Sequence, residues 1–420
     1  MSLQPRWLTV LFAALVTFSV YTCMYGYRKA FTAAGYSNQS FLGIEYKIWL
    51  VTAQVIGYML SKFYGIRFIA EQIGKNRALL ILKLIAFSWL ALLGFALVPA
   101  PSNILFLLLN GFPLGMIWGL VFSYVEGRKA TEFMGAVLAS SFIFASGFAK
   151  SIGALLMQTL GVPEVWMPFV AGAIYFLPLV LFTALLEAIP SPTQDDMEQR
   201  CKREPMNGKQ RSAFIRQFFP GLLLLILSYI LLTILRDFRD NFANEILGEQ
   251  GLTGGAAIFT QTEIPVALLV LAAISMLMLI QNNYKAFFYN HLILIFGWLL
   301  ALGATLAFRG GWLPAFHWFL LTGTGLYMAY IPINCLYFDR MIATFRLTAN
   351  VGFVVYVADS FGYLGSVSVL FVKQFLSLDL SWTRFFTQMV IGMSLFSIVC
   401  TVLSMLYYRK RYAVFLKELP

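Results

Sequence analysis

Runs of about twenty apolar residues recur along the whole chain, and they constrain its fold more than any motif does. Each run is bounded by charged residues or by clusters of glycine, proline and asparagine. Such a run crosses the bilayer core as a helix, and the runs lack the alternation that a barrel strand requires. The twelve runs begin near Trp7, Tyr46, Leu79, Asn103, Phe133, Met167, Phe218, Ala256, Tyr289, Trp312, Thr348 and Thr383. We therefore expect an all-α polytopic membrane protein with twelve transmembrane helices.

The composition excludes most soluble classes. Of 420 residues, 60% are hydrophobic and 12% charged, whereas a soluble domain has about 45–50% apolar and roughly 25% charged residues. Two histidines, His291 and His317, and four cysteines offer no ligand spacing and no disulfide framework. We expect no metal, no cofactor and no enzymatic activity. We ascribe the net charge of +11 to the loops, and not to nucleic-acid binding.

Basic residues fall on one side of the predicted membrane. The loops that follow Val98, Leu160 and Ala243 carry none. By the positive-inside rule, we expect both termini to lie in the cytoplasm. We also expect the chain to span the bacterial inner membrane. We expect a monomer whose partners are the bilayer and a small anion. Outside the central segment, the basic residues of the cytoplasmic side are Arg6, Arg67, Lys75, Arg77, Arg128, Lys129, Lys285, Arg340, Arg346, Arg409, Lys410 and Arg411.

A long polar segment divides the chain into two halves. Residues 189–217 contain three prolines, an acidic patch and then a basic patch, which is typical of a cytoplasmic linker. We expect an N-terminal six-helix bundle over residues 1–188 and a C-terminal six-helix bundle over residues 218–420.

The two halves carry a weak internal repeat. At an offset of 213 residues the fourth and fifth spans align without a gap on the tenth and eleventh, and at 208 residues the first span aligns on the seventh. A repeat of this kind predicts two pseudo-symmetric halves of parallel topology. The matched residues include Tyr124 with Tyr337, Glu126 with Asp339, Phe148 with Phe361, Tyr21 with Tyr229 and Arg28 with Arg236.

Charged residues inside the spans are the functional signal. Each costs about 2.5–3.5 kcal/mol at the centre of a helix unless it has a partner or faces a wet cavity. Arg28, Lys62, Lys150 and Arg236 come from four different spans, so together they predict an anion site. Two arginines related by the repeat can grip one tetrahedral anion from both halves, and Tyr27 and Tyr58 can add hydroxyl donors.

Other readings of these charges stay open. Arg28 and Arg236 can snorkel to the interface, and the neighbours of Arg236 can form local ion pairs. Lys62 and Lys150 can have a structural role. Asp359 can neutralise Lys150 or carry a coupling proton. We assign Asp359, Glu263 and Lys29 to coupling or gating.

Four stretches resemble one branch of the major facilitator superfamily, the organophosphate:phosphate antiporters, which include the glycerol-3-phosphate and hexose-phosphate transporters. They are Tyr27-Arg28-Lys29-Ala30-Phe31, Gly57-Tyr58-Met59-Leu60-Ser61-Lys62-Phe63, Leu235-Arg236 and Phe361-Gly362-Tyr363-Leu364-Gly365. The resemblance implies the major facilitator fold and an anion site at Arg28, Arg236 and Lys62. The chain is also similar to a little-characterised bacterial membrane-protein family related to these transporters.

The sequence departs from that branch at three places. Lys150 stands near the position of the branch's fifth-span histidine, and Gly65, Glu71 and Arg77 only loosely match the superfamily loop after the second span. Asp359 adds a negative charge that is not expected in the core of that branch. We expect a secondary active transporter of a small organic anion, such as phosphate or a phosphate ester, that works by alternating access. The alternative is a membrane receptor or sensor that binds such an anion without net transport.

Overall fold

The first half of the chain forms six long helices. The computed structural model describes residues 6–36, 39–71, 76–126, 128, 130–191, 208–252, 255–347, 352–375 and 380–418. A 3-10 turn, η1 (Ala30–Ala33), and a two-stranded hairpin of β1 (Ser40–Phe41) and β2 (Ile44–Glu45) connect the first two helices. The six helices are α1 (Arg6–Lys29), α2 (Tyr46–Glu71), α3 (Arg77–Leu97), α4 (Ile104–Phe122), α5 (Thr131–Leu160) and α6 (Met167–Leu186).

The second half repeats this plan. Its long helices are α8 (Gly208–Asn241), α10 (Ile258–Met278), α11 (Asn283–Arg309), α12 (Ala315–Pro332), α14 (Gly352–Phe375) and α15 (Trp382–Glu418). A short helix, α9 (Ala243–Glu249), follows α8, and α12 continues through a π-helical segment, η2 (Ile333–Tyr337), into α13 (Phe338–Phe345). Helix α8 begins inside the segment predicted to link the halves. Residues 192–207 of that segment lie outside the described residues, so its predicted bounds stay a prediction.

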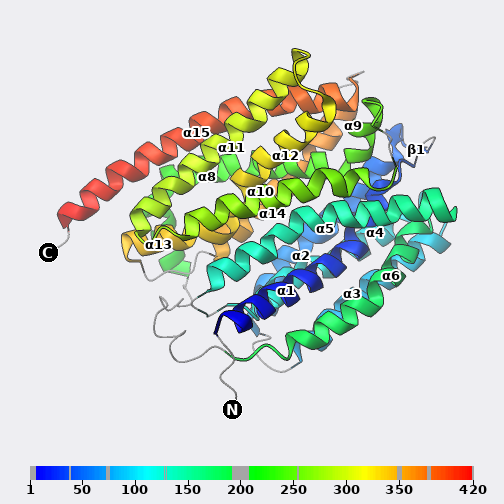
Figure 1. Cartoon of the computed structure of the whole chain (residues 1–420), viewed down its shortest axis with the longest axis horizontal. Helices are drawn as coiled ribbons and strands as arrows, with labels where there is room; N and C mark the ends of the chain where they lie inside the picture. The colour runs from blue at the N-terminus through cyan, green and yellow to red at the C-terminus, as the bar shows by residue number, and fades with distance from the viewer. Residues whose placement is uncertain are drawn as a thin grey trace.

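The packing follows a pseudo-twofold pattern. Within the first half α1 packs on α5 and on α6, and within the second half α8 packs on α14 and on α15 in the same way. Among the described residues, the two most extensive contacts between the halves are those of α5 with α10 and of α2 with α14. The repeat relates these two contacts to each other, since α5 corresponds to α14 and α2 to α10. In Figure 1 the helices of both halves run roughly side by side, with α13 at one end of the bundle and α9 and β1 at the other.

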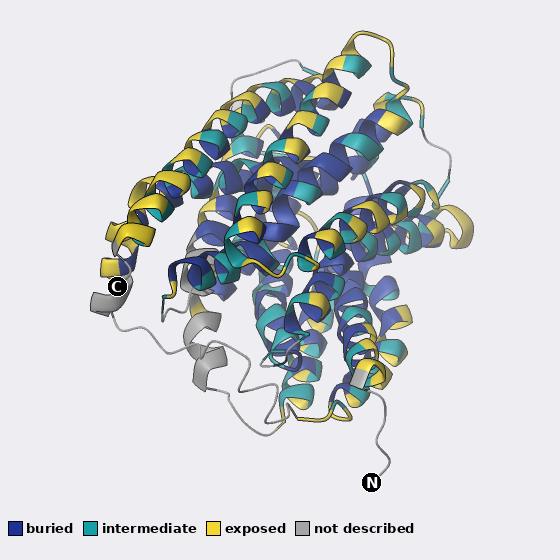
Figure 2. Ribbon diagram, turned by 60° about the vertical axis from the view of Figure 1, so that its left-hand side comes forward, coloured by how far each residue is buried: buried dark blue, intermediate teal, exposed yellow. Residues whose placement is uncertain are grey.

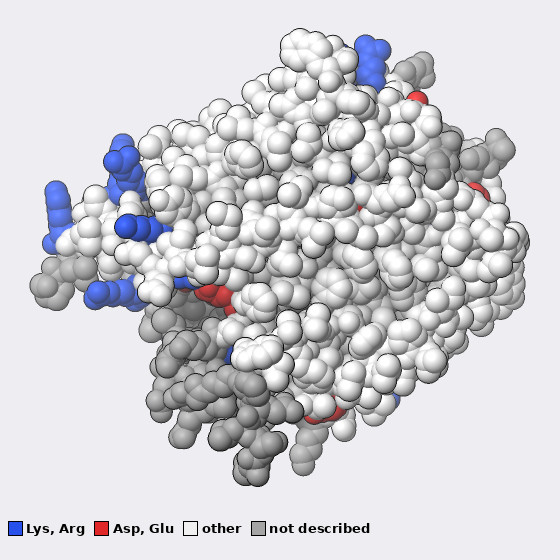
Figure 3. Space-filling view, viewed as in Figure 1, with Lys and Arg blue, Asp and Glu red and all other residues white. Residues whose placement is uncertain are grey.

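The outer surface of the bundle suits a bilayer. Among the described residues, ten helices are long and apolar enough to cross a membrane, and α2 and α14, with 26 and 24 residues, complete the two sets of six. Exposed residues lie on the outward faces of the helices (Figure 2). On the face seen in Figure 3 the surface between the ends is largely free of charge, and basic residues gather where α15 ends. The chain is therefore a polytopic membrane protein of twelve helices in two halves.

Glycines bring the helices into close contact inside each half. A Cβ atom on Gly57 of α2 would lie 2.1 Å from the Leu108 carbonyl oxygen, and one on Gly111 of α4 would lie 2.2 Å from the Gln54 carbonyl oxygen. Small residues let membrane helices approach until their backbones touch. The α2–α4 contact therefore depends on these two positions.

We predict that Gly57→Ala lowers the stability of the protein by roughly 1–3 kcal/mol, because the added methyl group must push α2 away from α4. Thermal unfolding in detergent measures the effect. Gly303→Ala on α11 is the matched control, since no atom lies within 4 Å of a Cβ built there. Equal melting temperatures for the two variants would contradict the close packing of α2 on α4.

Candidate functional site

Two buried arginines, Arg28 of α1 and Arg236 of α8, stand at matching positions of the two halves. Their exposed fractions are 5% and 7%. Arg28 lies over the Tyr58 ring, 3.8 Å from its centroid, and Arg236 lies 4.2 Å from the centroid of Tyr330. Arg236 also donates to the adjacent Asp237 carboxylate at 2.7 Å. Among the described residues the Arg28 side chain has no hydrogen bond and no carboxylate partner, and its buried Nε is unsatisfied.

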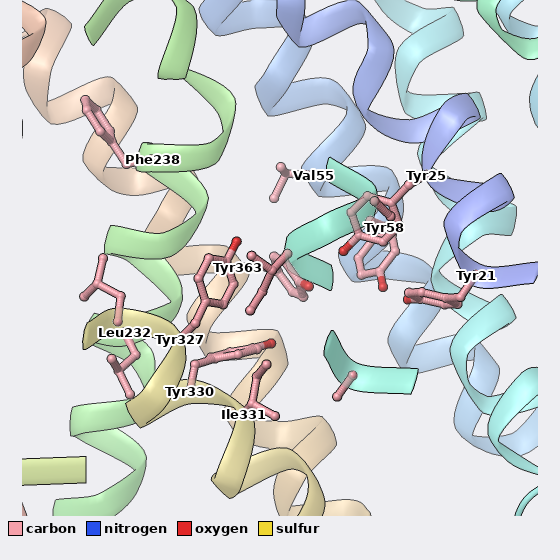
Figure 4. Close-up of a cluster of buried hydrophobic side chains, with 14 of the residues drawn as sticks. Tyr21, Tyr25, Val55, Tyr58, Leu232, Phe238, Tyr327, Tyr330, Ile331 and Tyr363 are labelled. Atoms are coloured by element: carbon pink, nitrogen blue, oxygen red, sulfur yellow. The ribbon is translucent and has the colours of Figure 1, made fainter. Parts of the chain in front are cut away.

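Tyrosine rings connect the two arginines across the boundary between the halves. The rings of Tyr58 and Tyr363 meet edge to face at 5.2 Å. Tyr25 and Tyr363 lie within electrostatic reach of both guanidinium groups. Figure 4 shows these side chains facing those of the other half, with Tyr330 pointing across the boundary. An aromatic face partly compensates the charge of a cation that lies over it. The rings therefore lower the free-energy cost of burying the arginines and leave their N–H groups as hydrogen-bond donors.

A single carboxylate, Asp240, ties α8 to two helices of the first half. Its oxygens lie 2.6 Å from Lys29 Nζ of α1 and 2.7 Å from Lys150 Nζ of α5. The Ser146 hydroxyl also donates to Asp240, and Lys29 donates to Asn241 at 2.7 Å. All of these groups except Asn241 converge on one carboxylate, so one negative charge is shared by two positive charges.

The second bridge between the halves joins α2 to α14. Lys62 Nζ lies 3.1 Å from Asp359 Oδ2, and the Tyr229 hydroxyl donates to the other oxygen of Asp359. Tyr229 in turn stacks on Tyr330, with the ring centroids 5.2 Å apart. Asp359 therefore neutralises Lys62. The interpretation from the sequence that Asp359 neutralises Lys150 is wrong, because Lys150 pairs with Asp240.

Two further residues that the sequence assigned to the site, Glu263 and Tyr27, lie away from Arg28 and Arg236. Glu263 of α10 pairs with Arg239 of α8 at 2.7 Å within the second half. The Tyr27 ring packs inside the first half, 6.2 Å from the Trp89 ring. It does not join Tyr58 beside Arg28, since successive residues of a helix point to different faces.

Ion pairs between the halves also stand at both ends of the bundle. Lys47 of α2 lies 2.6 Å from Glu245 of α9, near the hairpin. At the other end Arg340 of α13 lies 2.8 Å from Glu132 of α5. Glu245 is outside the spans, and burial raises the pKa of its carboxyl group although the Lys47 ammonium group opposes the shift.

Tyr330, Tyr363 and Asp240 were not among the residues assigned to the site from the sequence. A signal for one of them is present, since Tyr327 and Tyr330 are three residues apart and share a face of α12. Asp240 is one of the charged neighbours of Arg236 for which the sequence suggests local ion pairs, but its observed partners lie 90 or more residues away along the chain.

Comparison with known families decides the affiliation of the chain. Residues 30–411 match the model of a family of unknown function, DUF5690. The chain belongs to this family. The match includes Arg236 and every carboxylate of the site, whereas Arg28 precedes its first residue by two positions. No curated protein matches this DUF5690 chain by sequence.

Solved structures of transporters are similar to it in fold. A bacterial homolog of the human lysosomal transporter Spinster, inward-facing and unoccupied, matches with a TM-score of 0.60 at 12% identity, covering 99% of both chains. The xylose transporter XylE from E. coli gives 0.59 at 14% identity over 93% of this chain and 96% of that one. A mutant of the nucleoside transporter NupG gives 0.61 at 15% identity over 94% and 99%. The DUF5690 chain therefore has the major facilitator fold.

The buried bridge Lys62–Asp359 predicts strong energetic coupling. Asp359→Leu alone leaves the Lys62 charge without this carboxylate and costs about 3–5 kcal/mol, whereas adding Lys62→Met recovers much of the loss. A double-mutant cycle on unfolding in detergent measures the coupling. The same cycle on Arg340 and Glu132, whose side chains are 12% and 32% exposed, is the control and gives about 1 kcal/mol or less. Equal coupling in both cycles would contradict a buried bridge.

Proposed function

We propose that this protein is a secondary active transporter of a small organic anion, with phosphate and phosphate esters as the first candidates. The observation that carries the proposal is Arg28, a guanidinium group buried at the boundary between the halves that has no carboxylate partner in the part of the chain that the structure describes. The fold supports transport, because major facilitator proteins bind substrate at this boundary and rock their halves around it. The four stretches similar to the organophosphate:phosphate antiporters support the anion. The protein acts as a monomer in the bacterial inner membrane, with both termini cytoplasmic.

The buried charges favour a doubly charged substrate. Lys47 and Glu245 balance each other at one end of the bundle. Apart from that pair, the spans bury six cations and four carboxylates among the described residues around the boundary, which leaves a net charge of +2. The cations are Arg28, Lys29, Lys62, Lys150, Arg236 and Arg239, and the carboxylates are Asp237, Asp240, Glu263 and Asp359. A dianion bound between the arginines balances this charge, and a phosphate monoester is a dianion at neutral pH.

The bridges give the lysines and carboxylates a gating role in this proposal. Asp240 and Asp359 each join a helix of one half to a helix of the other. The halves cannot separate there unless these pairs break. In this proposal Lys62 and Lys150 add positive potential to the anion site, and Lys29, Asp359 and Glu263 tune gating or protonation around it.

We predict that Arg28→Gln weakens phosphate binding by about 100-fold, because the variant removes the charge but keeps much of the side-chain volume. Counterflow of phosphate in proteoliposomes and binding to the purified protein measure the effect. Arg309→Gln, at the exposed end of α11, is the control and keeps normal exchange. Near-normal exchange by Arg28→Gln would refute the anion site. If the unaltered protein binds phosphate but shows no counterflow, the result favours a receptor.

A dianion site also predicts a pH dependence that arises from the substrate. The second pKa of a phosphate monoester is about 6, so raising the pH from about 5 to about 7 converts the monoanion to the dianion and increases the apparent affinity. A sulfate ester of the same alcohol keeps one charge over this range and is the matched control. A sulfate ester that binds as tightly as the phosphate ester at neutral pH would contradict a preference for dianions.

A further inference from the structure

The two arginines of the site differ in the residue that follows each of them. The offset of 208 residues that matches Arg28 to Arg236 also matches Lys29 to Asp237. Arg236 and Asp237 are both buried, and Arg236 Nη2 lies 2.7 Å from Asp237 Oδ1. Arg28 has no carboxylate partner among the described residues. The second half therefore carries a built-in anion at its arginine, whereas the first half carries a lysine at the matching position.

Asp237 differs from the other buried carboxylates of the described spans in what its ion pair joins. Asp240 and Asp359 each bridge the two halves. Glu263 pairs with Arg239, away from the two arginines of the site. Asp237 pairs with an arginine of the site, and both partners belong to α8. This ion pair can therefore break while the two halves stay packed together.

The contact with Asp237 leaves Arg236 able to bind a second anion. Successive residues of a helix point to different faces, so the contact forms only because the long Arg236 side chain bends toward its neighbour. Its buried Nε has no hydrogen-bond partner, and a guanidinium group has five N–H donors in all. On the other side of Asp237, the Ser366 hydroxyl of α14 lies 3.2 Å from Oδ2. Asp237 therefore keeps one donor when Arg236 turns to an anion.

We propose that Asp237 is a specificity-determining residue, which competes with the substrate for Arg236 and limits the charge of a well-bound substrate to two. This inference rests on the proposed function, since the anion binds at Arg28 and Arg236. With Asp237 ionised, the buried charges around the boundary sum to +2. Without its charge, six cations would stand against three carboxylates, a sum of +3. A third negative charge on the substrate has no cation to balance it and is repelled by Asp237.

Two phosphate esters of nearly equal size test the proposal. Ethyl phosphate carries two charges at about pH 8, and phosphoglycolate carries three, because a carboxylate replaces the methyl group. Calorimetry on the purified full-length protein gives both affinities, and we expect the unaltered protein to bind ethyl phosphate more tightly. Asp237→Asn removes the charge at nearly constant volume and shifts the ratio of the two affinities toward phosphoglycolate by about ten-fold. Glu45→Gln, at an exposed position of β2, is the control and leaves the ratio unchanged.

Three results would overturn the role of Asp237 and leave the proposed function intact. They are tighter binding of phosphoglycolate by the unaltered protein, an unchanged ratio in Asp237→Asn, and an equal loss of both affinities in that variant. The last result would mean that Asp237 only positions Arg236. Failure of the unaltered protein to bind either ester overturns the proposed function as well.

A second variant, Ser366→Ala, keeps the charge of Asp237 and covers the case in which Asp237→Asn does not fold. The Ser366 hydroxyl matters most when Arg236 has turned to the anion, because it is then the donor that Asp237 keeps. We expect Ser366→Ala to lower the affinity for ethyl phosphate about five-fold. Ser368→Ala on the same helix, whose exposed hydroxyl donates to the Leu364 carbonyl, is the matched control and keeps the affinity. Equal affinities of the two serine variants would contradict a competition for Arg236.

Discussion

A charged group deep in a bilayer has to find a partner, and most of the structure of this protein follows from where those partners lie. Lys29 and Lys150 meet Asp240, and Lys62 meets Asp359, in each case across the boundary between the two halves. Each ion therefore depends on the other half to be tolerated in the membrane. Lipid covers the apolar faces of the helices, whereas the buried charges find their ion-pair partners only when the two halves pack together.

Arg28 is the exception to this pattern. Its counterpart Arg236 has Asp237 beside it, while among the described residues Arg28 has aromatic faces and no carboxylate partner. Rings supply part of the compensation that a carboxylate would give. In the function that we propose, an anion that enters from outside supplies the rest, and it leaves again more readily than a built-in carboxylate would allow. A site that has to release its ligand is better made of tyrosines than of acids.

Much of the fold is predictable from the sequence, because hydrophobicity acts on each span by itself. The twelve spans and the two halves follow from runs of apolar residues and from the repeat. The partners of the charges do not follow, since they depend on which helices face each other. Asp359 lies close in sequence to the position that the repeat matches to Lys150. Residues that the repeat matches occupy the same place in different halves, so they need not touch. Tyr27 shows the same limit at short range: it adjoins Arg28 in sequence but points into the first half, where it packs on Trp89.

The pairs at the two ends of the bundle, Lys47–Glu245 and Glu132–Arg340, each join the same two halves. When the halves part at one end, the pair there is lost while the pair at the far end can persist. In the alternating access that we propose, the far pair then serves as a pivot, and the pivot changes from one end of the bundle to the other in each cycle. This motion leaves no continuous open path from one side of the membrane to the other, because both pairs would have to be absent at the same time.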